Sequence, residues 1–145
     1  DFRQNQVVAD IHGAHARPHS IVWHPRKEHC FLTAGHDDTV HMWDLRKVAE
    51  PVVSFQGHAP LTTKRFKHIH RPHFLSSSGE DGNDYVLSGS ENSGCLSMFQ
   101  CNPKLENPGE IVSVYRRGRL PDECGDVKQV AVHGSSAAVA VDGGE

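Results

Sequence analysis

The stretch of sequence that decides the fold reads Phe31-Leu32-Thr33-Ala34-Gly35-His36-Asp37-Asp38-Thr39-Val40-His41-Met42-Trp43-Asp44. It contains most of one apolar-rich run, at 30–34, and all of a second, at 39–43, and a polar turn separates the two runs. The second run alternates between the two sides of an extended chain, as a half-buried strand does. Farther out, a run at 20–23 ends at a His-Pro pair, and another run covers 51–55. These patterns predict four short strands joined by turns.

The chain repeats itself with a fixed period. Asp1-Phe2-Arg3 recurs as Asp44-Leu45-Arg46, and Gly13-Ala14-His15 recurs as Gly57-His58. Asp1 to Asp44 and His15 to His58 are each 43 positions. Because two independent markers keep the same spacing, we infer a structural repeat.

Four strands in a period of about 40 residues are the build of one β-propeller blade. Residues 13–58, with a Gly-His element followed by the stretch that ends in Trp43-Asp44, resemble the WD-repeat family. The resemblance implies an all-β fold, a fragment of a β-propeller made of four-stranded antiparallel blades.

The resemblance also implies a hydrogen-bonded tetrad inside the blade. In that family it joins a loop His, a Ser or Thr of the second strand, a turn Asp and the Trp of the third strand. By position these residues are His15, Thr33, Asp37 and Trp43. The chemistry suits burial, because an imidazole needs partners on both nitrogens and an indole N–H needs an acceptor. We expect the tetrad to be structural, and we predict no catalytic residue.

The second unit departs from the pattern. We expect strands at 85–90 and 94–99, but Phe99-Gln100 stands where Trp-Asp would be. The turn 91–94 is one residue longer than its counterpart, so we expect an incomplete tetrad. Asp44 to Gln100 is 56 positions, 13 beyond the period. We expect most of this excess in the polar stretch 76–83, a long insertion between the first two strands.

Further runs predict a fourth strand at 111–115 and the first two strands of another unit at 126–132 and 137–141. The expected organisation is the end of a preceding blade with its connector at 1–14, a complete blade at 15–55, a degenerate blade at 56–118 and the start of a further blade at 119–145. Because propellers close with about 4 to 8 blades, the remaining blades are expected outside this chain.

Composition limits the classes of function. The net charge of −3 creates no field that would attract nucleic acid. The four Cys form no Cys-x-x-Cys pair, which favours reduced thiols in the cytoplasm or nucleus. No apolar stretch approaches the roughly 18 residues that span a membrane. We therefore expect a cytoplasmic or nuclear protein without membrane insertion.

Three alternatives to a scaffold rest on individual side chains. His68, His70 and His73 have the alternate spacing of a strand-borne metal site, but no Cys or carboxylate stands at ligand spacing, so we expect no metal and no cofactor. The groups of His15, Thr33 and Asp37 are also those of a hydrolase triad, but no nucleophile elbow accompanies them, so no enzyme is expected. The basic stripes 64–67 and 116–119 fit RNA, although lysine and arginine commonly protect a strand edge.

The segment from Phe31 to Arg46 ends Trp43-Asp44-Leu45-Arg46 and is similar to the sixteen-residue box of WD-repeat substrate receptors of cullin-type ubiquitin ligases. The resemblance implies that Arg46 contacts the adaptor and that Arg3 ends a second such box. WD-repeat proteins with other roles also carry Asp-x-Arg after the Trp. The receptor is therefore an alternative hypothesis, by analogy of motif.

Our principal hypothesis is a WD-repeat scaffold that mediates protein–protein interactions within a multi-subunit complex, without catalysis. The loops on the face most used in this family would meet the partners. They contain His36, Asp38, His58 and Asn92.

Overall fold

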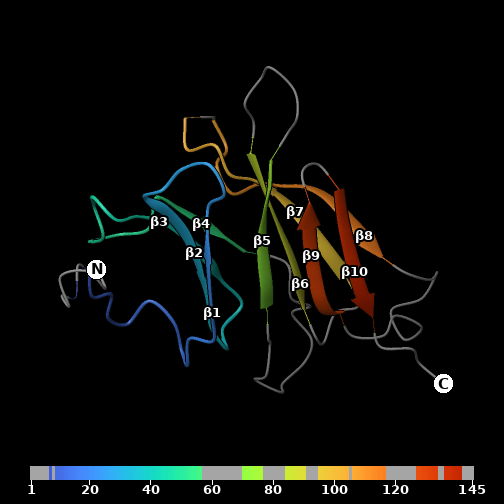
Figure 1. Ribbon diagram of the computed structural model, residues 1–145, viewed down its shortest axis with the longest axis horizontal. Helices are drawn as coiled ribbons and strands as arrows, with labels where there is room; N and C mark the ends of the chain where they lie inside the picture. The colour runs from blue at the N-terminus through green and yellow to red at the C-terminus, as the bar shows by residue number, and fades with distance from the viewer. Residues whose placement is uncertain are drawn as a thin grey trace.

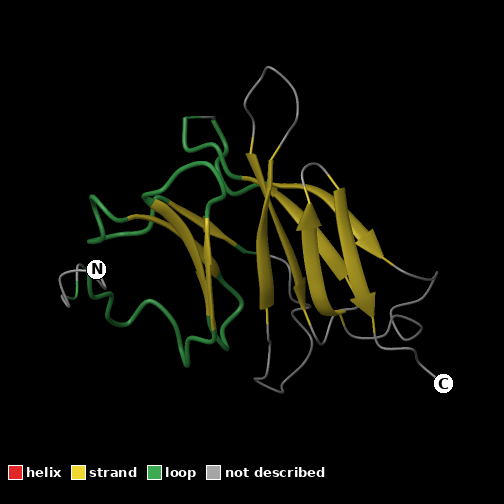
Figure 2. Cartoon of the chain, viewed as in Figure 1, coloured by secondary structure: helices red, strands yellow, loops and turns green. Residues whose placement is uncertain are grey.

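The structure, a computed structural model, describes residues 7, 9–56, 70–76, 84–90, 95–104, 106–116, 127–133 and 136–141. Every regular element within these ranges is a β-strand (Figure 2). The strands are β1 (Ser20–Trp23), β2 (Cys30–Ala34), β3 (Val40–Asp44), β4 (Val53–Phe55), β5 (His70–Ser76), β6 (Asp84–Ser90), β7 (Cys95–Gln100), β8 (Ile111–Arg116), β9 (Val127–His133) and β10 (Ser136–Val141). No helix able to cross a membrane occurs in this part of the chain.

The strands form three antiparallel sheets in chain order. The first sheet contains β1 to β4, the second contains β5 to β8, and β9 pairs with β10. In the first sheet Trp23 pairs with Phe31, which pairs with Trp43. In the second sheet Phe74 pairs with Val86, which pairs with Phe99. This common register makes Phe74 the equivalent of Trp23, and Phe99 the equivalent of Trp43.

The main core lies between the first two sheets. Leu32, Val40 and Phe55 of the first sheet are fully buried, as are Val86 and Phe99 of the second. The rings of Phe55 and Phe99 meet edge to face, with centroids 5.5 Å apart. Burying a side chain of this kind stabilises the fold by about 1.5–3 kcal/mol. The two sheets are therefore joined by apolar packing across their faces.

The first strands of the three sheets are neighbours, because β5 contacts both β1 and β9. In Figure 1, β5 lies between the first sheet on the left and the pair of β9 and β10 on the right. Four-stranded antiparallel sheets placed side by side around their first strands are the blades of a propeller. The predicted fold class, an all-β propeller fragment, is confirmed.

Strand limits differ slightly from the predicted runs. The fourth strand begins at Val53 rather than at Pro51, since proline has no N–H to donate to a ladder. Trp23 and Phe31 are eight positions apart, whereas their equivalents Phe74 and Val86 are twelve apart. The connection between the first two strands of the second sheet thus holds only four of the 13 extra residues, fewer than expected. The stretch 77–83 lies outside the described residues, and the boundaries of the four units stay predictions.

Candidate functional site

A chain of hydrogen bonds joins the four residues of the predicted tetrad. The indole Nε1 of Trp43 donates to Thr33 Oγ1 at 2.8 Å, and this hydroxyl lies 2.7 Å from His15 Nε2. His15 Nδ1 is 3.1 Å from both carboxylate oxygens of Asp37. Since Nδ1–H donates to the carboxylate, Nε2 accepts the hydroxyl proton of Thr33. The His15 side chain is only 2% exposed, and both of its nitrogens are bonded.

Asp37 is the most heavily bonded member of the tetrad. Besides His15, it accepts hydrogen bonds from Ala16 N at 3.0 Å and from the amide and hydroxyl of Thr39 at 3.1 and 2.6 Å. Burial alone would raise the pKa of Asp37, but the hydrogen bonds from Thr39 and His15 lower it to about 2. Asp37 therefore fixes the His15 loop and the β2–β3 turn to each other.

Gly35 explains how the loop reaches the sheet. A Cβ on Gly35 would lie 2.5 Å from His15 Cβ and 2.9 Å from the carbonyl oxygen of Ala16. His36 N also donates to that carbonyl at 2.7 Å. The close approach of the loop therefore requires glycine at this position.

His41 extends the network, although it is not among the residues predicted from the sequence. Its ring lies 4.7 Å from that of His15 and 5.9 Å from that of Trp43, and its Nδ1 is 2.9 Å from Ser54 Oγ. Burial and the neighbouring His15 lower the pKa of His41. The only signal in the sequence was its place in the alternation of β3, two residues before Trp43.

The second sheet has a different interior at the same place. Ser88 occupies the position of Thr33 by register, and Phe99 occupies that of Trp43. The phenyl ring of Phe99 has no counterpart of the indole N–H, and the fully buried Ser88 Oγ has no hydrogen-bond partner among the described residues. His58 lies outside these residues, so the expected incomplete tetrad stays a prediction.

Only some of the residues expected to meet partners are described. His36 and Asp38 flank Asp37 in the β2–β3 turn, where Asp38 is exposed and the ring of His36 is 5.5 Å from that of His19. His58, Asn92 and Arg3 lie outside the described residues.

Arg46 is presented at the surface in a fixed orientation. Its Nε donates to Asp44 Oδ1 at 2.9 Å and its Nη2 donates to Oδ2 at 2.5 Å, while its side chain stays 71% exposed. Hydrogen bonds from the Arg46 side chain and amide lower the pKa of Asp44. The end of the predicted box is therefore accessible to a partner.

The outer face of the first sheet is apolar and exposed. Ile21 is 66% exposed and Trp23 is 54% exposed, whereas the equivalent Pro72 and Phe74 of the second sheet are buried against the first sheet. A cavity of about 490 Å³ under residues 9–15 is lined by Ile21, Trp23 and Phe31. The face that the second sheet buries is thus exposed to solvent on the first sheet.

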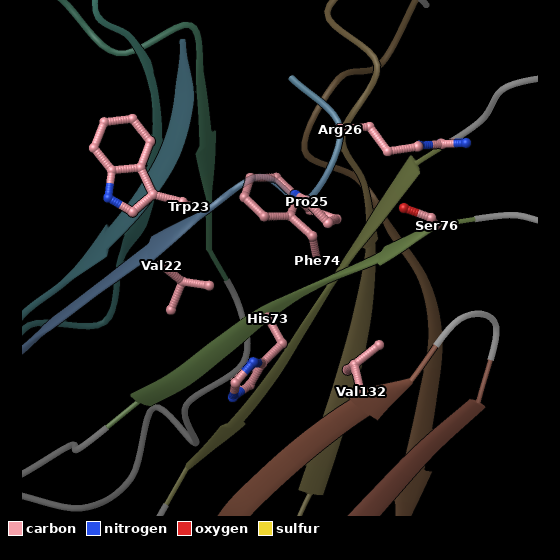
Figure 3. Close-up of a pocket in the computed structure, with 8 residues that line it drawn as sticks. All are labelled: Val22, Trp23, Pro25, Arg26, His73, Phe74, Ser76 and Val132. Carbon is pink, nitrogen blue, oxygen red and sulfur yellow. The ribbon is translucent and has the colours of Figure 1, made fainter. Parts of the chain in front are cut away.

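A second cavity of about 390 Å³ lies where the three sheets meet. Figure 3 shows Val22 and Trp23 of β1, Phe74 of β5 and Val132 of β9 around it. His73 also lines it, and burial lowers the pKa of this imidazole. The described residues contain no group of three potential metal ligands, while His68 of the His-rich stretch lies outside them.

No family model matches the chain. It is 31% identical over 68 residues to the GATOR2 complex protein WDR24 of Gallus gallus, a match that covers 45% of this chain and 10% of that protein. The Danio rerio protein of the same name is 29% identical over 68 residues, which cover 45% of this chain and 9% of that protein.

Histone acetyltransferase type B subunit 2 of Candida glabrata is 25% identical over 117 residues, which cover 79% of this chain and 26% of that protein. The chain thus spans about a quarter or less of the length of these curated relatives.

Proposed function

We propose that the chain belongs to the WD-repeat family and is part of a propeller scaffold that mediates protein–protein interactions within a multi-subunit complex, without catalysis. The names of two relatives identify members of the GATOR2 complex, and the third is a subunit of a histone acetyltransferase. These names support a role in a protein complex.

The observation that carries the proposal is the hydrogen-bonded tetrad of His15, Thr33, Asp37 and Trp43. Its imidazole, hydroxyl and indole groups bond one another inside the blade, and His15 is almost completely buried. The Thr33 side chain is buried and its oxygen accepts the indole N–H of Trp43, so this hydroxyl is not presented to a substrate, as a nucleophile must be. The network instead gives rigid support to the loops that carry His36 and Asp38, and rigid loops suit recognition.

The exposed face of Ile21 and Trp23 supports the proposal that further blades precede this one. The second sheet buries its equivalent face against the first sheet, so a preceding sheet would cover Ile21 and Trp23 in the same way. Covering two large apolar side chains contributes roughly 1.5–3 kcal/mol each.

The test of the scaffold is recovery of stable partners by the protein in cells. Alanine at both His36 and Asp38 is expected to reduce recovery of a defined set of co-purifying subunits, measured by quantitative mass spectrometry at equal expression. A matched control replaces Lys104, which is exposed on the β7–β8 connection, with alanine. Turnover in a hydrolase screen that Asp37→Asn abolished without unfolding would instead identify an enzyme.

The accessible Arg46 favours one second candidate, a substrate receptor of a cullin-type ubiquitin ligase. Loss of adaptor binding in Arg46→Ala, with unchanged thermal unfolding, would support it. Adaptor binding unaffected by replacement of both Arg3 and Arg46 would exclude this route. For either candidate we propose a cytoplasmic or nuclear location and protein rather than nucleic-acid partners.

A further inference from the structure

A buried carboxylate joins the first two sheets. Asp84 is the first residue of β6, and its side chain is 1% exposed. It accepts hydrogen bonds from His24 Nε2 at 3.1 Å and from Lys27 Nζ at 2.6 Å, and it forms an ion pair with Arg26. All three donors follow β1 of the first sheet, so the contacts cross from one sheet to the next.

His24 is held in one protonation state by its own turn. Its Nδ1 accepts hydrogen bonds from the amides of Arg26 and Lys27, both at 3.1 Å, which leaves the proton on Nε2 for Asp84. Its ring centroid is 4.4 Å from that of Phe74 on β5. Protonation of Nδ1 would place a donor against two backbone donors, which breaks both bonds of the turn.

Two charged side chains, Arg26 and Lys27, lie half exposed beside the buried pair of His24 and Asp84. Cys101 donates from its thiol at 3.0 Å and from its amide at 3.3 Å to the Asp84 carbonyl oxygen. Cys30 accepts the His24 amide through its carbonyl oxygen at 2.9 Å. Burial raises the pKa of both thiols, that of Cys101 to about 12, so the thiols add no negative charge near neutral pH.

This junction has no counterpart elsewhere in the two sheets. By register Leu75 stands at the position of His24, and His29 stands at the position of Asp84. The pair is therefore a feature of one junction between sheets rather than of every repeat.

We propose that His24 and Asp84 form an acid-sensitive latch between the first and second sheets, closed while His24 is neutral and released when His24 takes up a proton. Burial lowers the pKa of His24 from 6.5, and this effect exceeds the opposing attraction of Asp84. The folded state therefore binds fewer protons than the unfolded state just below pH 6.5. The contribution of the latch is complete above pH 6.5 and is lost as the pH falls below 6.5 through the lowered pKa of His24.

The test compares urea unfolding midpoints at pH 7.5, 6.5 and 5.5. His24→Gln retains a side-chain N–H for Asp84 but cannot take up a proton. We expect the midpoint of the natural chain to fall at pH 5.5 and that of His24→Gln to fall much less. His12→Gln is the matched control, because His12 is 87% exposed, and its midpoint should follow the natural chain. Equal falls in all three proteins would overturn the latch.

NMR of the natural chain keeps the proposal testable if His24→Gln does not fold. The nitrogen shifts of His24 should show a neutral ring protonated at Nε2 until amide exchange at Arg26, Lys27 and Cys101 accelerates in acid. The amide of Trp43, on the other side of the first sheet, should stay protected over the same range. Ordinary titration of His24 near pH 6.5 with these amides still protected would refute the latch.

Discussion

Gly35 and His15 approach so closely that a Cβ on Gly35 would lie 2.5 Å from the Cβ of His15. The two residues are 20 positions apart, and the contact exists because Asp37 and Thr33 bind the His15 imidazole from both sides. The loop before the first strand and the turn after the second strand therefore behave as one unit.

Gly35→Ala should weaken this unit. The added methyl group meets His15 Cβ and the Ala16 carbonyl oxygen, neither of which is the far end of a flexible side chain. We expect a loss of roughly 1–3 kcal/mol in the free energy of unfolding, measured with urea. Gly13→Asn is the control, because Gly13 has open space around it and asparagine tolerates its positive φ. A neutral Gly35→Ala would show that the loop is not held as described.

Thr33→Val and Ser88→Ala should have opposite effects although the two residues are equivalent by register. Valine leaves the Trp43 N–H and His15 Nε2 without their partner, at a cost of about 1–3 kcal/mol for each group. Alanine at Ser88 removes a buried hydroxyl that has no partner in the described part of the chain, so the midpoint should stay unchanged or rise. Similar losses in both variants would contradict this difference.

Acid should destabilise the natural chain partly through Asp37. Its pKa is about 2 in the folded protein, against 3.8 as its ordinary value. The lowered pKa means that the contribution is present above pH 3.8 and is lost as the pH falls toward 2. The shift corresponds to on the order of 2 kcal/mol.

Asp37→Asn should therefore lower stability at neutral pH and flatten its dependence on pH below 4, as followed by circular dichroism. Asp38→Asn, at the exposed neighbour, is the matched control and should retain the acid dependence.

The two tryptophans should respond differently to acrylamide. Trp43 is 3% exposed and Trp23 is 54% exposed, so most fluorescence quenching should come from Trp23. Trp23→Phe should leave a blue-shifted, weakly quenched emission. In a longer polypeptide that contains the preceding blade, Trp23 should lose its accessibility. Continued quenching there would mean that no blade covers this face.

The strands were largely predictable because each depends on local patterning. The run Ser20–Trp23 and the run Cys30–Ala34 match β1 and β2, since turns with Pro25 or Gly35 bound them. The start of β4 was harder to predict. A proline such as Pro51 allows an extended backbone, as a strand needs, but it has no N–H to donate to the sheet. The tetrad residues were predicted through the repeat. The role of His41 was not predicted, because the alternation of a strand does not show which side chains a histidine contacts.

By itself, the sequence determined the four-strand unit and the tetrad residues of its interior, because spacing and alternation are properties of the chain alone. Only the tertiary structure decided that Gly35 packs against His15 and that Trp23 is exposed while Phe74 is buried. It also decided that Asp84 accepts a hydrogen bond from His24, 60 positions away in the sequence. The physical reason is that burial and hydrogen-bond partnership depend on which face of one sheet packs against the next. No pattern within a single strand contains that information.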